Sequence, residues 1–235
     1  MRAVILAAGL GKRLGPLAEG QPKVMIPVDG KPPLERHIER LGSAGVEEIF
    51  INLHHQPQVI TGYFGGGERW GMRLRYAYEP ELLGTAGAVR NFGPHLTGGP
   101  FLVVYGDNTV DIDYADFIRF GEGTESLGVI AVHLRDDVSG SGIVEFGPDG
   151  RIARFIEKPE AAAVFSRWAS AGIYRFSPRI LEHLEPGYSD FGRDVFPRLL
   201  KRRESLTAYP LEVPLVAIDT PELLAEASRA DREPS

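Results

Sequence analysis

The 235-residue chain contains no cysteine. This absence excludes disulfide bonds, thiolate zinc sites and cysteine nucleophiles. The chain also lacks any apolar run near 18 residues, so the sequence predicts no membrane-spanning helix. Its net charge of −6 gives no overall positive surface for nucleic acid or an anionic membrane, and neither partner is expected. The N-terminus has no signal-peptide pattern, which favours a cytoplasmic protein.

Glycine, by contrast, is concentrated after the first apolar run. Residues 3–8 are continuously apolar, as in a strand buried on both faces, and the loop 9–15 that follows contains three glycines with Lys12 and Arg13 among them. Glycine lets the backbone approach a ligand, and successive exposed N–H groups bind anions. The two cations in the same loop therefore favour phosphate.

The two common phosphate-loop motifs do not fit this loop. A P-loop requires Gly-x-x-x-x-Gly-Lys-Ser/Thr, whereas Arg13 follows Lys12 here. A dinucleotide fingerprint requires Gly-x-Gly-x-x-Gly, and Gly15 comes one residue too late. The loop therefore belongs to another class of phosphate site.

The first half of the chain alternates strand and helix patterns. Strands are predicted at 3–8, 48–53, 74–79 and 101–105, and helices at 33–41, 58–64, from 83, and 113–120. Such alternation indicates right-handed βαβ units in a doubly wound parallel sheet.

The second half has a different rhythm, with strands that follow one another directly. Strands are predicted at 127–134, 142–146, 152–156, 169–176 and 216–219, and helices near 178–184, 194–201 and 221–227. Pro148-Asp149-Gly150 indicates a hairpin turn. The expected fold class is α/β, a Rossmann-like doubly wound mixed sheet whose second half is partly antiparallel.

Polar residues follow the predicted strands where parallel sheets bind ligands, outside their carboxyl ends. Asp107 ends the strand 101–105 and suits Mg2+, which takes one or two carboxylates together with substrate phosphates; the plainer alternative is a turn cap. Arg13 and Lys23 suit phosphate, although most such cations are simply solvated. His54 and His55 are adjacent, so a strand would direct them to opposite faces, which argues against a metal site.

Five separated motifs resemble those of the nucleotidyltransferases that join a sugar 1-phosphate to a nucleoside triphosphate, with the mannose- and heptose-1-phosphate guanylyltransferases as the nearest type. The motifs are Leu-Ala-Ala-Gly-x-Gly-x-Arg-Leu-x-Pro-Leu from Leu6, Pro22-Lys23 with Pro27–Pro32, Gly106-Asp107, Glu157-Lys158-Pro159, and Ala171-Gly172-Ile173-Tyr174. The resemblance extends from Met1 to about Ala227. It implies the nucleotide-diphospho-sugar transferase fold.

The resemblance also implies the organisation and reaction of the chain. One domain is expected over 1–228, with a nucleotide-binding half at 1–125, a sugar-phosphate-binding half at 126–228 and a disordered tail at 229–235. The implied substrates are a nucleoside triphosphate and a sugar 1-phosphate, with Mg2+ as cofactor and pyrophosphate and a nucleotide sugar as products. A monomer or a homodimer is expected.

The matching positions receive roles through this resemblance. The catalytic residues are Arg13, Lys23 and Asp107. The residues implied to bind the nucleotide are Leu6, Ala8, Gly9, Gly11, Lys12, Arg13, Glu79, Gly84 and Thr85. Those implied to bind the sugar phosphate are Asn108, Gly142, Glu157, Lys158, Ser170 and Gly172. The implied metal ligands are Asp107 and Asp219.

Glu79 lies where the family reads the base. A carboxylate only accepts hydrogen bonds, which suits the paired N1–H and N2–H2 donors of guanine, whereas an amide suits uracil or thymine better. The sequence therefore favours GTP over the other nucleotides. A simple exposed strand-end carboxylate is the alternative interpretation of Glu79.

Two departures from the family pattern leave alternatives open. Ser170 replaces the family asparagine, and Ala217 stands where the second metal aspartate is usual, with Asp219 two residues later. Because Ile218-Asp-Thr-Pro221 also occurs in cytidylyl transfer, a cytidylyltransferase acting on a non-sugar phosphate such as phosphocholine is one alternative. A nucleotide-sugar-binding regulator without catalytic activity is the other.

Overall fold

The computed structural model describes residues 1–11, 14–15, 20–212, 215–218, 220 and 222–224. The chain forms two compact units, each made of separate segments. The first comprises Met1–Leu82, Val104–Tyr114 and Leu215–Ser235, and the second comprises Leu83–Val103 and Ala115–Pro214. Strand β4 (Phe101–Tyr105) is divided between them, because its last two residues belong to the first unit.

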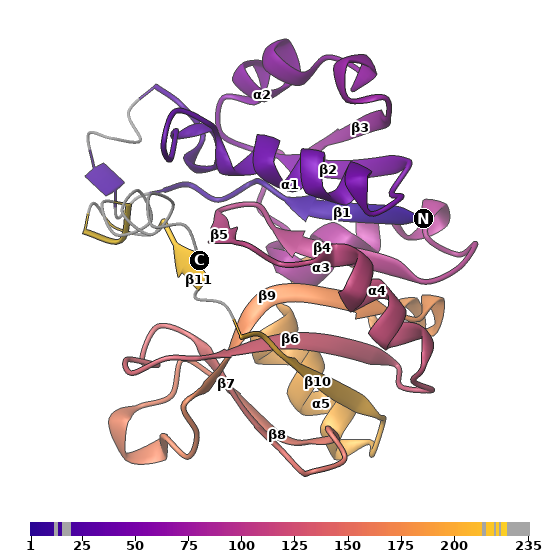
Figure 1. Ribbon diagram of the computed structural model, residues 1–235, viewed down its shortest axis with the longest axis vertical. Coiled ribbons are helices and arrows are strands. Elements are labelled where there is room, and N and C mark those ends of the chain that lie inside the picture. The colour runs from indigo at the N-terminus through magenta and orange to yellow at the C-terminus, as the bar shows by residue number, and fades with distance from the viewer. Residues whose placement is uncertain (12–13, 16–19, 213–214, 219, 221, 225–235) are drawn as a thin grey trace. The chain divides into compact units, whose positions relative to one another are not determined.

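A parallel sheet forms the first unit. Strand β2 (Glu48–Leu53) pairs in parallel with β1 (Arg2–Leu6) on one side and with β3 (Arg73–Tyr78) on the other (Figure 1). Helices α1 (Pro33–Ser43) and α2 (Pro57–Phe64) make the connections between the strands. Every residue of β2 is buried, as the largely apolar segment 48–53 predicts for a central parallel strand.

Helix α1 follows from its apolar spacing. Leu34, Ile38 and Leu41 recur at helical intervals and are fully buried. Proline stands at the first helical position, where its missing N–H costs nothing, and Gly45 (φ 83°) follows the C-terminus in a left-handed conformation. The predicted helix at 33–41 is therefore confirmed, with two further residues at its end.

Short elements complete the first unit. A single 3-10 turn spans Lys23–Met25, and another spans Glu68–Trp70. Strand β5 (Asn108–Val110) pairs antiparallel with β11 (Leu215–Ala217), which joins the end of the chain to the residues just after Asp107. The sequence did not predict β5, because three residues are too few to show a period.

The second unit is a mixed sheet. Strand β6 (Gly128–Leu134) pairs antiparallel with β9 (Trp168–Phe176) and parallel with β10 (Leu206–Pro210) (Figure 1). Strands β7 (Gly142–Phe146) and β8 (Ile152–Glu157) form the predicted hairpin. The expected mixed α/β sheet is confirmed, while β10 was not predicted from its sequence.

The helices of the second unit are short. They are α3 (Gly84–Asn91), 3-10 turns at Gly93–His95, Ala161–Ala163 and Pro178–His183, a π-helix at Phe191–Val195, and α5 (Phe196–Lys201), together with all but the first residue of α4 (Tyr114–Glu122). The helix predicted near 178–184 is thus a 3-10 helix. Phe191 and Phe196 stack at 5.5 Å between ring centroids, and the rings of Tyr174 and Phe176 join them in one aromatic core.

Three expectations on the limits of the chain stay predictions. The boundaries at 125 and 228 are not tested by the two units, and the tail 229–235 lies outside the described residues. Of the predicted helix at 221–227, the described residues 222–224 are helical. Among the helices formed by the described residues, none combines the length and apolar character required to cross a membrane.

Candidate functional site

The carboxyl end of the parallel sheet carries a chain of buried polar groups. The backbone N–H of Ala7 donates to Oδ1 of Asn52 at 2.8 Å, and Nδ2 of Asn52 donates to Oε1 of Glu79 at 2.9 Å. Asn52 is 4% exposed and Glu79 is 2% exposed. These hydrogen bonds join the residues that follow β1 and β3 through the end of β2.

The backbone of Glu79 is held as firmly as its side chain. Its N–H donates to the carbonyl of Leu53 at 2.7 Å, and its carbonyl accepts from Nδ1 of His54 at 2.7 Å. Because a carbonyl can only accept, Nδ1 of His54 carries a proton. His54 therefore positions the backbone of Glu79.

The glycine loop after β1 is open at its start and anchored further on. Gly9 is exposed, and Gly11 has a left-handed backbone (φ 61°). The N–H of Leu14 donates to the carbonyl of Gly11 at 2.9 Å, and the Leu14 side chain packs with Ile26 and other buried apolar residues. The predicted phosphate ligands Lys12 and Arg13 lie outside the described residues.

A glycine brings the Asp107 segment against the end of β1. The N–H of Gly106 donates to the carbonyl of Leu6 at 3.0 Å. A β-carbon at position 106 would lie 2.9 Å from Cγ2 of Ile5 and 3.0 Å from the Leu6 carbonyl oxygen, so only glycine fits without displacement. This close approach places Asp107 beside the predicted nucleotide loop.

Asp107 forms an ion pair with Lys23. Nζ of Lys23 donates to Oδ2 of Asp107, and Lys23 is 5% exposed whereas the Asp107 side chain is 27% exposed. The Asp107 carbonyl accepts from the N–H of Ile218 at 3.2 Å, which holds the segment after β11 against the backbone of Asp107. Two of the three predicted catalytic residues are therefore in direct contact.

The donor set at Asp107 fits a hard divalent cation. The partly exposed carboxylate of Asp107 offers oxygen, the ligand that Mg2+ prefers, and the Lys23 ammonium is paired with one of its two oxygens. Among the described residues, no group of three or more histidine, aspartate and glutamate side chains could hold a metal ion. The other predicted ligand, Asp219, lies outside the described residues and follows Ile218 directly.

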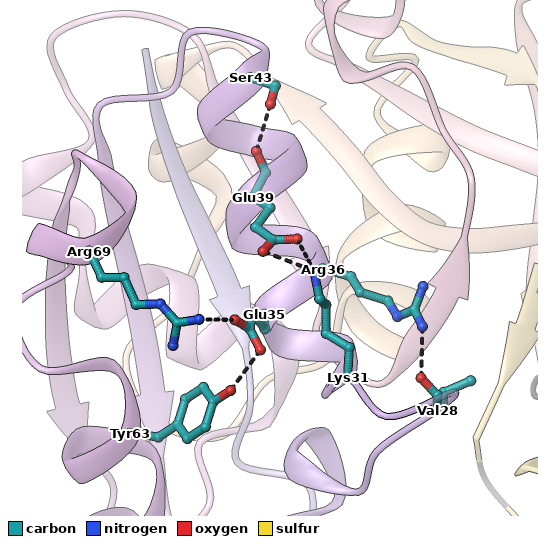
Figure 2. Close-up of polar contacts among 8 residues, drawn as sticks. All are labelled: Val28, Lys31, Glu35, Arg36, Glu39, Ser43, Tyr63 and Arg69. Atoms are coloured by element: carbon teal, nitrogen blue, oxygen red, sulfur yellow. Dashed lines mark hydrogen bonds and ion pairs between the residues drawn. The ribbon is translucent and has the colours of Figure 1, made fainter.

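Helix α1 holds the segment that leads from Lys23 into the helix. Nη2 of Arg36 donates to the Val28 carbonyl at 2.7 Å, and Lys31 is paired with Glu39 at 2.8 Å. Both contacts are drawn in Figure 2. Val28 and Lys31 also bond to each other through their backbones. These contacts fix the turn at 28–31 and thereby the position of the Lys23–Met25 turn before it.

At the start of the same helix, the carboxylate of Glu35 accepts from the hydroxyl of Tyr63 at 2.8 Å and lies 3.6 Å from Nη2 of Arg69 (Figure 2). Glu35 is itself 3% exposed. Glu35 therefore connects α1 to Tyr63 of α2 and to Arg69, which precede β3 in the chain.

Helix α1 also holds the segment that follows Asp107. The two ring nitrogens of His37 bond to the Asn108 carbonyl and to the Tyr114 hydroxyl, each at 2.9 Å. Because the carbonyl can only accept, Nε2 of His37 is the donor and Nδ1 accepts from Tyr114. Arg40 donates to the Val110 carbonyl one turn further along the helix.

In the second unit, Gly84 and Thr85 fasten the start of α3 to the residues 189–191. Gly84 has φ 72°, and a β-carbon there would lie 2.5 Å from the Ser189 carbonyl oxygen. The Thr85 hydroxyl donates to Oδ2 of Asp190 at 2.9 Å and accepts from the N–H of Phe191 at 2.9 Å. The Thr85 hydroxyl is therefore engaged with this segment.

Glu157 lies between two glycines. A β-carbon on Gly142 would lie 2.7 Å from Oε2 of Glu157, and one on Gly192 would lie 2.3 Å from the same atom. Burial raises the pKa of Glu157, the nearby Asp190 raises it further, and the cations Lys158 and Arg193 act in the opposite direction. The carboxylate predicted to bind the sugar is therefore buried close to the backbone of both glycines.

The other predicted sugar-phosphate residues of this unit lie at strand ends and bends. Lys158 has a left-handed backbone (φ 49°) where β8 ends, and its N–H donates to the Ser141 carbonyl at 2.9 Å. The Ser170 hydroxyl lies 3.3 Å from the hydroxyl of Tyr174 and accepts from the N–H of Gly172 at 3.4 Å.

The family described as "Nucleotidyl transferase" matches residues 2–213 of the chain. The chain belongs to this family. It is 32% identical over 215 residues to the UTP–glucose-1-phosphate uridylyltransferase of Synechocystis sp., a match that covers 85% of the chain and 55% of the relative. It is 31% identical over 202 residues to the mannose-1-phosphate guanylyltransferase catalytic subunit beta of Dictyostelium discoideum, with 85% and 56% covered. The chain spans about half the length of the curated relatives it matches.

Solved structures give the same assignment of fold. A putative glucose-1-phosphate thymidylyltransferase from Bacillus anthracis superposes with a TM-score of 0.90 at 22% identity, covering 100% of the chain and 96% of that protein. HddC from Yersinia pseudotuberculosis, solved with GMP-PN, has a TM-score of 0.81 at 27% identity, with 98% and 99% covered. The resemblance to sugar-1-phosphate nucleotidyltransferases, drawn from the motifs, is confirmed.

Alanine substitutions at the two glycines beside Glu157 should differ in their effect on stability. Gly142→Ala would force its β-carbon to within 2.5 Å of the buried Phe155 ring, which cannot move away, so the free energy of unfolding should fall by about 1–3 kcal/mol. The nearest atoms to a β-carbon on Gly192 belong to the Glu157 side chain, which has more rotamer freedom than the Phe155 ring, so Gly192→Ala should lower the free energy of unfolding by less than Gly142→Ala does. Denaturant unfolding of both variants measures the contrast, and equal losses would contradict it.

Sequence reasoning on the family site missed the supporting residues. Asn52, His54, Asp190 and Gly192 belong to none of the motifs, yet each bonds or confines a predicted site residue. One signal was available for Asn52, which is the only polar residue among the last five positions of the strand Glu48–Leu53. For Asp190 and Gly192 no local signal existed, because their partners lie more than thirty residues away in sequence.

Proposed function

We propose that this chain transfers a nucleotidyl group from a nucleoside triphosphate, GTP in preference, to a sugar 1-phosphate and releases pyrophosphate. The single observation that carries the proposal is the Lys23–Asp107 pair at the carboxyl end of a parallel sheet, in a chain of the nucleotidyl transferase family. Ligands of open α/β sheets bind at this edge. The names of the relatives support the same class of small-molecule substrates.

The proposed reaction needs no general base. An oxygen of the sugar 1-phosphate, already anionic at neutral pH, attacks the α-phosphorus of the triphosphate. The bond from that phosphorus to the bridging oxygen of the β-phosphate breaks, and pyrophosphate leaves. Catalysis then consists of positioning the two anions and offsetting their charge.

Each predicted residue has a task within this scheme. Lys23 and Arg13 steady the triphosphate and the leaving pyrophosphate, since an ammonium offers a point charge and a guanidinium a planar fork. Lys158 and the backbone at Gly142 hold the incoming phosphate, while Glu157 accepts from sugar hydroxyls. Asn108, Ser170 and Gly172 complete the sugar-phosphate site, and Leu6, Ala8 and Gly84 contribute backbone contacts to the nucleotide.

Mg2+ is the proposed cofactor, held by Asp107 and, at the end of the chain, by Asp219. When bound, it supplies positive charge to the phosphates of both substrates. Because the Lys23 ammonium is paired with Oδ2 of Asp107, a bound Mg2+ would share this carboxylate with Lys23.

The preference for GTP rests on Glu79. Its carboxylate accepts hydrogen bonds only, as the two donors of guanine require. The relatives' names include both uridylyl and guanylyl transfer, and HddC was solved with GMP-PN, so guanine nucleotides are in keeping with the family.

A substrate panel tests the proposal. GTP, UTP, CTP and ATP are each paired with mannose 1-phosphate, glucose 1-phosphate and phosphocholine in the presence of Mg2+, and pyrophosphate release is measured. We expect turnover with a sugar 1-phosphate and the highest kcat/KM for GTP. Turnover restricted to CTP with phosphocholine would replace the proposal with cytidylyl transfer. Nucleotide-dependent thermal stabilisation without turnover for any pair would indicate a binding protein without catalytic activity.

A further inference from the structure

The residue that follows Tyr188 is fastened to the start of helix α3. The N–H of Ser189 donates to the Leu83 carbonyl at 2.9 Å. The Ser189 carbonyl accepts from the N–H groups of Ala86 and Gly87, at 2.9 and 3.1 Å. Ser189 is also buried. These hydrogen bonds fix the backbone on the C-terminal side of Tyr188.

Two glycines of α3 allow the chain around Tyr188 to come this close. A β-carbon on Gly84 would lie 2.5 Å from the Ser189 carbonyl oxygen. A β-carbon on Gly87 would lie 2.3 Å from the carbonyl oxygen of Gly187, so the residue before Tyr188 is in close contact with α3 as well. The backbone of Tyr188 is therefore held between two neighbours that both lie against the same helix.

The side chain of Tyr188 is exposed although its backbone is fixed. It is 67% exposed, more than any other large hydrophobic side chain in the part of the chain that the structure describes. A β-carbon on Gly84 would lie 3.3 Å from Cε2 of the Tyr188 ring, so the ring borders this glycine. A flat side chain on a fixed backbone loses little conformational entropy when a ligand covers it.

The hydrogen-bond donors at the start of α3 are used by the protein itself. Two of its backbone N–H groups donate to Ser189. The Thr85 hydroxyl donates to Oδ2 of Asp190 and accepts from the N–H of Phe191, each at 2.9 Å. These three donors are engaged, which argues against a phosphate beside Tyr188.

The charge of the segment around Tyr188 also disfavours a phosphate. Residues 184–190 include Glu185 and Asp190 and contain no lysine or arginine. Two negative charges repel a triphosphate, whereas an uncharged base is not repelled. Every base also has a π-face that can stack on an aromatic ring. The base is therefore the part of a nucleotide that fits next to Tyr188.

We propose that Tyr188 binds the base of the nucleotide by stacking, next to Gly84. This inference rests on the proposed function, which assigns Gly84 to the nucleotide. Stacking uses the face of a base and leaves its hydrogen-bonding edge free, so it tolerates different bases. Tyr188 therefore adds affinity for each nucleotide that the protein binds, and it does not select one nucleotide over another.

Titration calorimetry with GTP, UTP and pyrophosphate, each with Mg2+ and without a sugar phosphate, tests this contact. Tyr188→Ala should raise the dissociation constant of every nucleotide that the wild type binds by about 5- to 100-fold, as expected for one stacked base. Binding of pyrophosphate, which has no base, should be unchanged. Tyr188→Phe should keep the wild-type affinities, because the ring and not the hydroxyl makes the contact.

Two further variants sharpen the test. Phe120, which is 38% exposed on α4, provides a matched control, and Phe120→Ala should bind nucleotides as the wild type does. Tyr188→Trp places an indole against the base, so GTP should quench its fluorescence more strongly than it quenches the wild type, whose signal comes from Trp70 and Trp168.

Thermal melts establish that each variant is folded before it is titrated. The inference fails if Tyr188→Ala binds nucleotides as the wild type does, if it loses pyrophosphate binding to the same extent, or if only the KM for the sugar 1-phosphate rises. Failure of the proposed function looks different. A wild type that binds nucleotides but releases no pyrophosphate with any substrate pair would refute the reaction and leave the base contact standing. A wild type that binds no nucleotide would refute both.

Discussion

Replacing Asp107 by asparagine is expected to lower kcat/KM at least about a hundredfold, the scale seen when a charge-stabilising group is removed from an active site. Asparagine keeps the shape of the side chain and can still accept from the Lys23 ammonium, but it removes the carboxylate charge that now balances Lys23. Asparagine is also preferable to alanine here, because Lys23 is buried and would lose this partner. Pyrophosphate release over a range of Mg2+ concentrations measures the effect.

Asp111 supplies a matched control for that experiment. Its carboxylate is paired with Arg40 at 2.9 Å, and its side chain is 85% exposed. Asp111→Asn therefore removes one negative charge four residues from Asp107 with little effect on stability. We expect its kcat/KM to stay within about twofold of the wild type. Equal rates for the Asp107 variant, the Asp111 variant and the wild type would remove Asp107 from the mechanism.

Lowering the pH from about 6.5 to about 4 should weaken the fold through His37. Burial lowers the pKa of His37 from its ordinary value of 6.5 to about 4; Arg40 also lowers it, whereas the bond to Asn108 and the charge of Asp107 oppose the change. In this window the unfolded chain binds a proton that the folded chain does not, so stability falls as the pH falls. The difference between the two pKa values corresponds to a loss of about 3 kcal/mol in the free energy of unfolding, most of which has occurred by about pH 4.

Unfolding in denaturant at pH 7 and at pH 4.5 measures this loss. His37→Gln keeps a donor in the position of Nε2 and does not titrate, so it should remove the His37 share of the pH dependence. His133 adds a similar share, because burial lowers its pKa to about 4 as well. A His37→Gln variant that keeps the pH dependence of the wild type would contradict the assignment.

The fold was largely predictable wherever a strand or helix is long enough to show its own hydrophobic period. The largely apolar segment Glu48–Leu53 and the helical spacing from Leu34 to Leu41 depend on local sequence, and both elements formed as expected. Strands β5 and β10 were missed for a physical reason. Each is stabilised by pairing with a segment far away in the chain, β5 with β11 and β10 with β6, and neither has a clear period of its own.

The sequence predicted charged residues of the candidate site, but it did not predict the residues that hold them in place. Lys23 and Asp107 were expected to act together, and the structure places them in an ion pair. The role of His37 was hidden, because its position at helical spacing indicated only a residue on the buried face of α1. Its partners, Asn108 and Tyr114, lie more than seventy residues away and become neighbours only in the fold.

The pairing of β11 with β5 bears on how the protein can be handled. Val216 lies opposite Thr109 and Ala217 opposite Asn108, and Ile218 bonds to the Asp107 backbone. Strand β11 is therefore part of the framework that holds the proposed metal ligand Asp107, although the two segments are far apart in the sequence. A truncation that starts at Leu215 would remove this pairing together with the buried side chain of Ile218, so it would disturb the proposed site and the packing of the first unit at once.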